Sequence, residues 1–211
     1  TSLAENNMEI IQRERMVAAT KLLDKAAQWC EDCLSVHMQA IAYSCIIEAP
    51  EKKRERLAQV NKLLQLPKLS IDTTSVDGAS VLGALVANQQ CPGIQYEDIA
   101  SMLNAMLVHE KYIRSGELPA KIHYQLATIA YAGQRFDDVE KIISTADEKW
   151  PDAQPVIEFR VEYYLQHRSR SAAIQYIRGK IAQQQRNAIQ LPRSYVIDLE
   201  RKLHELEKNE N

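Results

Sequence analysis

The chain has 211 residues, enough for one domain or one continuous array of repeats but short for two comfortably sized domains. It contains only 6 glycines and 7 prolines, which argues against glycine-rich phosphate loops and against the many tight turns of an all-β protein. A net charge of −2 gives no general attraction to nucleic acid or anionic lipid, and no apolar run is long enough to span a membrane.

The first third of the chain has the pattern of three helices. Apolar side chains recur at helical spacing over residues 5–28, which predicts one long amphipathic helix. A second helix is expected over residues 34–47 and is stopped by Pro50, and a third begins after Pro50 and ends before Pro67. The following polar segment is predicted to be a loop that ends at a helix N-cap, Thr74 or Ser75.

Two more helices are expected in the middle of the chain. Residues 76–90 are rich in glycine and alanine, which permits close packing against neighbouring helices. A turn at residues 91–95 leads into a helix over residues 96–112, and Gly116 and Pro119 mark the next break.

The last third of the chain is expected to hold two helix pairs over residues 120–186, with breaks at Trp150–Pro151 and at the basic turn 167–170. A final helix has an apolar seam (Val196, Leu199, Leu203 and Leu206) and a charged opposite side (Asp198, Glu200, Arg201, Lys202, Glu205 and Glu207). A polar outer face is typical of a terminal helix that ends a stack of repeats. The sequence therefore predicts an all-α fold of about ten antiparallel helices.

Residues 122–153 match the repeat pattern of a known family without a gap. Leu126 and Ala127 occupy the paired large and small positions of its first helix, and Phe136 the aromatic position at the turn. Ala146 and Pro151 occupy the late small position and the terminal proline. In this spacing the segment resembles the tetratricopeptide repeat, which has a period of about 34 residues.

The match is imperfect and weakens away from this segment. Val139 stands where the family has alanine, and Gln134 where it has glycine. One period further on, Tyr164 and Ala173 fall on repeat positions, and residues 36–43 resemble residues 122–129. The resemblance implies one α-solenoid domain over residues 1–211, with its best repeats at 120–153 and 154–187, degenerate repeats over 16–115 and a capping helix at 193–208. Other antiparallel helical bundles would give similar matches and remain the alternative.

The resemblance also implies a binding surface, because the first helix of each tetratricopeptide repeat lines a concave groove. Carried over by position, the groove residues are Tyr124, Thr128, Tyr131, Glu158, Glu162 and Gln166. Aromatic and hydrogen-bonding groups on a rigid wall suit an extended peptide or a glycan, although the tyrosines also fit a purely structural packing role.

A second resemblance concerns context. A CEDC motif ahead of a VHMQAIAY helix, followed by degenerate repeats and a polar tail, resembles the carboxy-terminal segment of bacterial polytopic glycan polymerases, ligases and glycosyltransferases of the O-antigen type. This resemblance implies a domain on the extracytoplasmic, periplasmic side of an inner membrane, with membrane helices of the same full-length chain as a partner. Without such helices, a cytoplasmic scaffold is expected.

The cysteines and histidines do not form a predicted metal or catalytic site. If residues 34–47 are helical, His37 and Cys45 lie about 12 Å apart along the axis, too far to share a zinc ion with Cys30 and Cys33. Redox catalysis is disfavoured because this cysteine pair is expected at a helix end, where the dipole disfavours a thiolate. A disulfide between Cys30 and Cys33 and a pair of unlinked thiols are both compatible with the sequence.

Two clusters of basic residues raise the question of nucleic-acid binding: Lys52, Lys53, Arg54 and Arg56, and, more loosely, Arg168, Arg170, Arg178 and Lys180. Aromatic residues do not alternate with them, so solvated helix faces are expected and nucleic acid is not a predicted partner. We therefore predict a non-catalytic module without cofactor or metal, which binds a protein or peptide partner. The alternative is an accessory domain that positions a glycan or lipid-linked substrate for a membrane glycan polymerase, ligase or glycosyltransferase.

Overall fold

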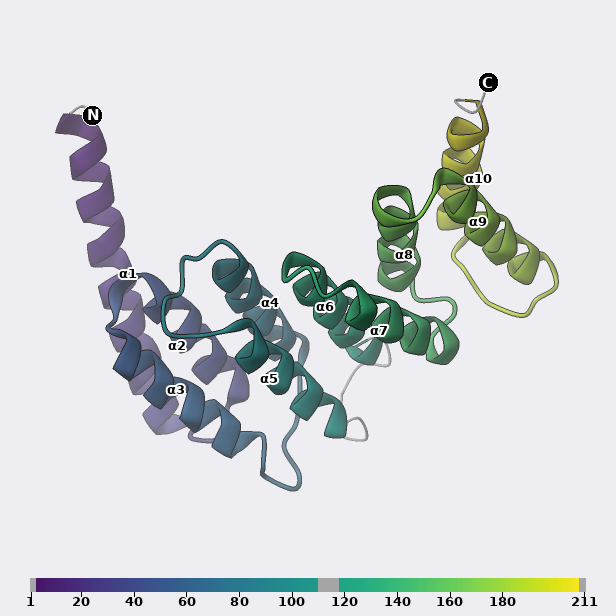
Figure 1. Ribbon diagram of the computed structural model, residues 1–211. Helices are drawn as coiled ribbons and strands as arrows, with labels where there is room; N and C mark the ends of the chain where they lie inside the picture. Colours follow the sequence, from purple (N-terminus) through teal and green to yellow (C-terminus); the bar gives the residue numbers. More distant parts are fainter. Residues whose placement is uncertain (1–2, 110–117, 209–211) are drawn as a thin grey trace. The chain divides into compact units, whose positions relative to one another are not determined.

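The computed structural model describes residues 3–109 and 118–208, and for residues 3–10 it describes the backbone alone. The prediction of an all-α protein is confirmed, because the described residues form ten helices and no strand. The helices are α1 (Leu3–Trp29), α2 (Leu34–Ile47), α3 (Pro50–Leu63), α4 (Thr73–Ala87), α5 (Tyr96–Val108), α6 (Leu118–Ala132), α7 (Phe136–Lys149), α8 (Gln154–His167), α9 (Arg170–Gln185) and α10 (Arg193–Lys208) (Figure 1).

The chain divides into two compact units, residues 1–134 and residues 135–211. The boundary lies between α6 and α7, inside the segment 120–153 that was predicted to be the best repeat. Whether that segment forms a tetratricopeptide hairpin stays a prediction, and each unit is described by itself below.

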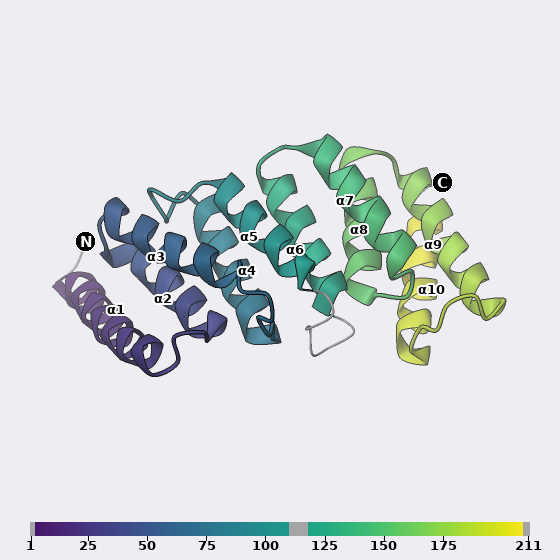
Figure 2. The ribbon, with the colours of Figure 1, turned by 90° about the horizontal axis from the view of Figure 1, so that it is seen from below.

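In unit 1, α4 lies at the centre of the packing. It contacts α2 and α6, while α1 and α3 pack on α2, and α5 packs on α4 and α6 (Figure 2). Two glycines of α4 allow these close approaches: a Cβ added at Gly78 would lie 2.8 Å from the Cβ of Met38 on α2, and one at Gly83 would lie 2.8 Å from Ile129 on α6. The small residues noted in the sequence therefore serve close packing on two sides of one helix.

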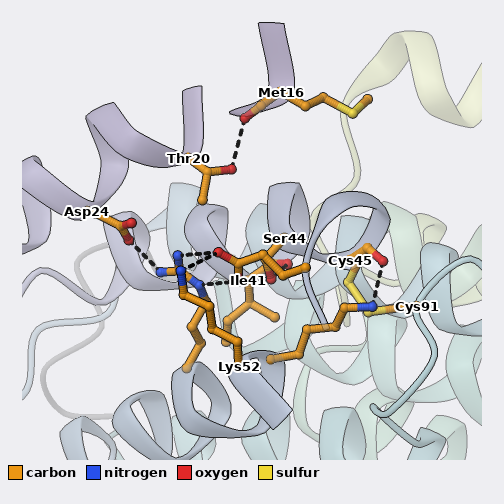
Figure 3. Close-up of polar contacts among 11 residues, drawn as sticks. Met16, Thr20, Asp24, Ile41, Ser44, Cys45, Lys52 and Cys91 are labelled. Atoms are coloured by element: carbon orange, nitrogen blue, oxygen red, sulfur yellow. Dashed lines mark hydrogen bonds and ion pairs between the residues drawn. A yellow bond between two sulfur atoms is a disulfide. The ribbon is translucent and has the colours of Figure 1, made fainter. Parts of the chain in front are cut away.

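A charged network joins α1 to the turn between α2 and α3. The Arg56 guanidinium donates two hydrogen bonds of 2.8 Å to the Glu48 carboxylate and one of 2.6 Å to Asp24 on α1 (Figure 3). Lys52 lies 3.2 Å from the same carboxylate. The hydrogen bonds from Arg56 hold the pKa of Glu48 below its ordinary value of 4.5, against the opposing effect of burial.

The end of α2 and the start of α3 are both bonded to the loop between α4 and α5. A disulfide joins Cys45 at the end of α2 to Cys91 in that loop. Lys53, only 1% exposed, donates a hydrogen bond of 2.7 Å to the carbonyl oxygen of Cys45 (Figure 3). It donates a second hydrogen bond, of 3.2 Å, to the carbonyl oxygen of Pro92. Because each carbonyl supplies a partner for the ammonium, the buried cation is a structural link and not a solvated charge.

Unit 2 has a continuous apolar core along α8, α9 and α10. Ile157 and Val161 of α8, Ile177 of α9 and Leu199 of α10 are buried together. The remaining residues of the predicted α10 seam, Val196, Leu203 and Leu206, pack against this cluster.

A second charged network, centred on Asp147 of α7, ties α7 to α8 and α9. Its carboxylate accepts hydrogen bonds from Tyr176 (2.8 Å) and Arg160 (3.2 Å) and lies 2.6 Å from the Lys180 ammonium. Lys180, 3% exposed, also donates to the carbonyl oxygen of Pro151 at 2.7 Å. Burial is the main cause that raises the pKa of the Tyr176 hydroxyl, and Asp147 raises it further.

Some local predictions were wrong. The N-cap of α4 is Asp72, whose carboxylate accepts a 2.8 Å hydrogen bond from the Ser75 amide, so Thr74 and Ser75 lie inside the helix. Pro119 lies in the first turn of α6, where its missing amide costs nothing. The break expected at Gly116 lies outside the described residues. None of the helices among residues 3–109 and 118–208 has the length and apolar composition needed to cross a membrane.

Candidate functional site

The predicted groove residues lie on two helices that belong to different units. On α6 of unit 1, the side chains are half-buried, and those residues are Tyr124, Thr128 and Tyr131. On α8 of unit 2, the side chains are exposed, and those residues are Glu158, Glu162 and Gln166. The Thr128 hydroxyl donates to the carbonyl oxygen of Tyr124 at 2.9 Å, within its own helix. That the two sets line one groove stays a prediction.

Two of these residues, Glu158 and Glu162, line a cavity of about 550 Å³ between α8 and α10. The other lining residues are Val161 of α8 and Tyr195, Asp198, Leu199, Arg201, Lys202 and Glu205 of α10. The side of α10 that was predicted to face solvent therefore forms one wall of a cavity. We take this α8–α10 cavity as the candidate functional site.

The floor of the α8–α10 cavity is apolar and well fixed. Val161, Tyr195 and Leu199 are buried and belong to the core cluster of unit 2. Helical spacing places Tyr195 and Leu199 one turn apart on the same face of α10. A ligand in the cavity would therefore contact a rigid surface, because the floor side chains are held by the core behind them.

The rim of the cavity is charged, and its two cations are already paired. Lys202 forms an ion pair with Glu162 across the two helices. Arg201 lies 2.8 Å from Asp198, one turn away on α10. Glu158 and Glu205 have no hydrogen-bond or ion-pair partner among the residues that the structure describes. The cavity therefore has an excess of negative charge.

The Tyr195 hydroxyl is the most unusual group of the site. The residue is 8% exposed, and within the described parts of the chain its buried hydroxyl has no hydrogen-bond partner. Burial is the main cause that raises the pKa of this hydroxyl, and the Glu158 and Asp198 carboxylates raise it further. The phenol therefore stays protonated near neutral pH and keeps an unused donor and acceptor beside two carboxylates.

Sequence reasoning did not select Tyr195, although a signal was present. Tyr195 precedes Leu199 by four residues, so it shares the apolar face of α10 that the seam defined. A tyrosine at a core position must find a partner for its hydroxyl, and no neighbour in the seam could supply one.

A second cavity of about 560 Å³ lies between α7 and α8. His167 lies in its wall between Phe136 and Tyr163, with ring centroids 4.5 and 5.5 Å away. Two acidic side chains, Asp137 and Glu140, line it, and the Glu140 carboxylate lies 3.6 Å from the Arg168 guanidinium and 3.6 Å from that of Arg160. Glu140 Oε2 is buried without a hydrogen bond from the described residues, but the two guanidinium groups neutralise its carboxylate. The charges of the lining, Asp137 and Glu140 against Lys141 and Arg168, also cancel, so this cavity lacks the excess negative charge of the α8–α10 cavity.

The basic runs of the sequence are not solvated faces throughout. Lys53 and Lys180 are buried and bonded to backbone carbonyl oxygens, and Arg56 is bonded to Glu48. The expectation of solvated faces is wrong for these residues, because tertiary contacts bury them.

The two remaining cysteines, Cys30 and Cys33, form a disulfide between α1 and α2. Together with Asp32 they place ligand-type atoms within 4.8 Å of one another. Disulfide sulfurs lack the thiolate form that zinc requires, so this group does not fit a zinc site in its oxidised state. Cys30 directly follows the end of α1, as expected for a place where the helix dipole disfavours a thiolate, whereas Cys33 is the N-cap of α2 and departs from that expectation.

Comparisons with protein-family models, with curated proteins and with solved structures find no match for this chain. The tetratricopeptide resemblance therefore depends on the residues quoted above, and the function must be argued from the site.

Proposed function

We propose that this chain is a non-catalytic protein-binding module, built from helix hairpins stacked in the manner of tetratricopeptide repeats. Packing within unit 1 supports the stacking, because α2, α4 and α6 contact one another in succession and odd-numbered helices pack beside them. In unit 2, each helix from α7 to α10 packs on the next. Successive contacts of this kind are what a solenoid requires.

The observation that carries the proposal is the α8–α10 cavity. Its apolar floor is rigid, two rim carboxylates have no partner among the described residues, and the Tyr195 hydroxyl is buried without one. Buried polar groups in proteins are nearly always hydrogen-bonded, so the unused Tyr195 hydroxyl is a place where a bound partner can supply the bond. A fixed wall with unused polar groups is typical of recognition surfaces.

All four cysteines are joined in disulfides, which supports an oxidising compartment such as the periplasm. This observation also favours the second candidate function, an accessory domain of a bacterial membrane glycan polymerase, ligase or glycosyltransferase that works on the extracytoplasmic side. In that case the module would position a glycan or lipid-linked substrate for the membrane-bound part of the enzyme.

Capture experiments separate the two candidates. The chain and its variants Glu158→Ala and Tyr124→Ala are immobilised and exposed to an extract of the source cells, with Glu148→Ala as the control. Glu148 is exposed on α7 and has no partner among the described residues, so its loss should change nothing. A protein retained by the parent chain and the control but lost with Glu158→Ala supports the protein-binding module. Loss of glycan synthesis in cells with unchanged protein capture would favour the second candidate, and equal capture by all four forms would refute the first.

A further inference from the structure

We infer that the α8–α10 cavity binds the arginine or lysine side chain of an extended, basic segment in a protein partner. This inference rests on the proposed function and specifies the chemistry of the partner. It follows from three features of the cavity: its unbalanced charge, its unpartnered hydroxyl and its apolar floor.

The charge argument concerns the carboxylates that remain after internal pairing. Lys202 neutralises Glu162, and Arg201 neutralises Asp198, which leaves Glu158 on α8 and Glu205 on α10. Glu158 also lies four residues before Glu162 on the same helix face, where like charges repel. A cation between the helices would relieve this repulsion and complete the pairing.

The Tyr195 hydroxyl is an independent indication of a ligand. It has lost its contact with water and gains no hydrogen bond from the described residues, which is unfavourable for folding by itself. Its oxygen can accept a hydrogen bond from a guanidinium or ammonium group. Such a donor would stand next to Glu158 and Asp198, the two carboxylates that influence this hydroxyl.

The floor distinguishes a basic side chain from a bare cation. The cavity is lined by the Tyr195 ring over the nearly buried side chains of Val161 and Leu199, and the methylene stem of arginine or lysine would pack on this apolar floor while its charged end reaches polar groups. A divalent metal ion would gain nothing from this surface, and a protonated phenol is not among the oxygen ligands that calcium or magnesium prefers. Nucleic acid is disfavoured because its phosphates would be repelled by the carboxylates.

The test uses the full disulfide-bonded chain and fluorescein-labelled peptides of equal length, measured by fluorescence anisotropy. One peptide carries three arginines separated by glycines, and its matched control carries citrulline, which keeps the shape of arginine without the charge. We expect the arginine peptide to bind at least tenfold more tightly than the citrulline peptide, with affinity that falls as salt is added.

Variants locate the binding. Glu158→Gln and Glu205→Gln should each weaken the arginine peptide about threefold to tenfold, because each removes one charge and keeps the shape. Glu200→Gln is the control, since Glu200 is an exposed carboxylate of α10 outside the cavity.

The hydroxyl is tested by a matched pair of changes. Tyr195→Phe should weaken the peptide about twofold to tenfold without lowering the midpoint of thermal unfolding, since no internal hydrogen bond is lost. Tyr176→Phe should do the reverse, because the Tyr176 hydroxyl donates to Asp147 at 2.8 Å and lies outside the cavity.

The inference is overturned if the arginine and citrulline peptides bind equally, or if neither binds at millimolar concentration. It is also overturned if calcium alone displaces the peptide at equimolar concentration, or if Tyr195→Phe destabilises the protein as much as Tyr176→Phe does. If a neutral peptide binds and Tyr195→Phe abolishes that binding, the inference of a basic partner is refuted, but the proposal of a protein-binding module is not. The module itself fails only in the capture experiment, where no protein would depend on Glu158.

Discussion

The Asp147 network gives the sharpest test of what holds unit 2 together. We predict that Asp147→Ala lowers the free energy of unfolding of this unit by about 3 kcal/mol. The change removes the acceptor of three donors at 2.6 to 3.2 Å, those of Lys180, Tyr176 and Arg160. The lost contact with Lys180 should account for most of this free energy, because the Lys180 side chain is only 4% exposed and water cannot replace the carboxylate.

The expected loss of unfolding free energy depends on which hydrogen bonds the three donors retain after Asp147 is removed. Breaking a buried ion pair by removing one partner costs about 3 to 5 kcal/mol. Lys180 keeps its 2.7 Å hydrogen bond to the Pro151 carbonyl oxygen, and Arg160 keeps its 2.9 Å hydrogen bond to the Tyr164 hydroxyl. The loss should therefore lie at the lower end of the range. In a unit of this size, about 3 kcal/mol corresponds to a fall of roughly 15 °C in the unfolding midpoint.

The assay follows the fluorescence of Trp150, which lies directly after α7, in a Trp29→Phe background. Trp29 is 90% exposed in unit 1, so its replacement should leave unit 2 unchanged. Urea titration gives the free energy of unfolding of the Asp147→Ala form and of the control Glu148→Ala. The control should change stability by less than about 0.5 kcal/mol, as exposed substitutions usually do. A loss below about 1 kcal/mol for Asp147→Ala would refute the view that this carboxylate compensates a buried lysine.

Three further predictions concern single contacts of unit 1, with one control glycine on α9 of unit 2. The pKa of Glu48 is lowered in the folded state, so the contribution of this carboxylate to stability is present above its ordinary pKa of 4.5 and is lost as pH falls below that value. Glu48→Gln should therefore flatten the acid side of a plot of unfolding free energy against pH, measured by urea unfolding. An unchanged slope in the variant would contradict this prediction. Removing the disulfide by Cys45→Ala with Cys91→Ala should cost about 4 kcal/mol in urea unfolding, because the bond spans a sequence separation of 46, and a cost below about 1 kcal/mol would argue against the linkage. Gly78→Ala should lower the melting midpoint, since the added Cβ would lie 2.8 Å from a neighbouring side chain. Gly179→Ala should raise the melting midpoint, because the added Cβ meets nothing within 4 Å and alanine favours the helix. Equal effects of the two changes would disprove the close approach at Gly78.

Helices were the part of the structure that the sequence predicted well. Residues 34–47 form α2 as expected, because proline and the apolar pattern bound that segment clearly. The long first helix was predicted over 5–28 and runs over Leu3–Trp29. The cap of α4 was missed because threonine and serine are also good caps, and only geometry shows that Asp72 accepts the amide hydrogen bond.

Contacts between distant segments could not be predicted from one sequence. Lys53 looks like part of a solvated basic run until the Cys45–Cys91 disulfide brings the carbonyl oxygen of Pro92 within reach of its ammonium. Lys180 is separated from its acceptor at Pro151 by 29 positions. Local patterns report the period of a helix, whereas burial of a charge depends on which loop lies over it.

The sequence did not predict the α8–α10 cavity, and the reason is physical. Glu158 and Glu162 were selected because they occupy concave positions of the repeat, and both line the α8–α10 cavity. The charged side of α10 was interpreted as facing solvent, because its residues alternate with an apolar seam. The same pattern fits a wall that faces a neighbouring helix across a gap, and sequence periodicity does not separate the two.

The buried polar groups of the protein also argue for a ligand at Tyr195 by contrast. Lys53 and Lys180 show that this fold provides partners for buried cations, with two carbonyl oxygens in one case and a carbonyl oxygen and a carboxylate in the other. The Tyr176 hydroxyl is likewise bonded, at 2.8 Å, to Asp147. Tyr195 lacks such a partner within the described part of unit 2, and it does so in a cavity whose rim carries carboxylates without internal pairs. The other buried polar atom without a hydrogen bond among the described residues is Glu140 Oε2, and it lies 3.6 Å from the Arg168 guanidinium, whereas the Tyr195 hydroxyl has no such cation beside it. A donor supplied by a bound partner would satisfy this hydroxyl as the internal partners satisfy the other groups.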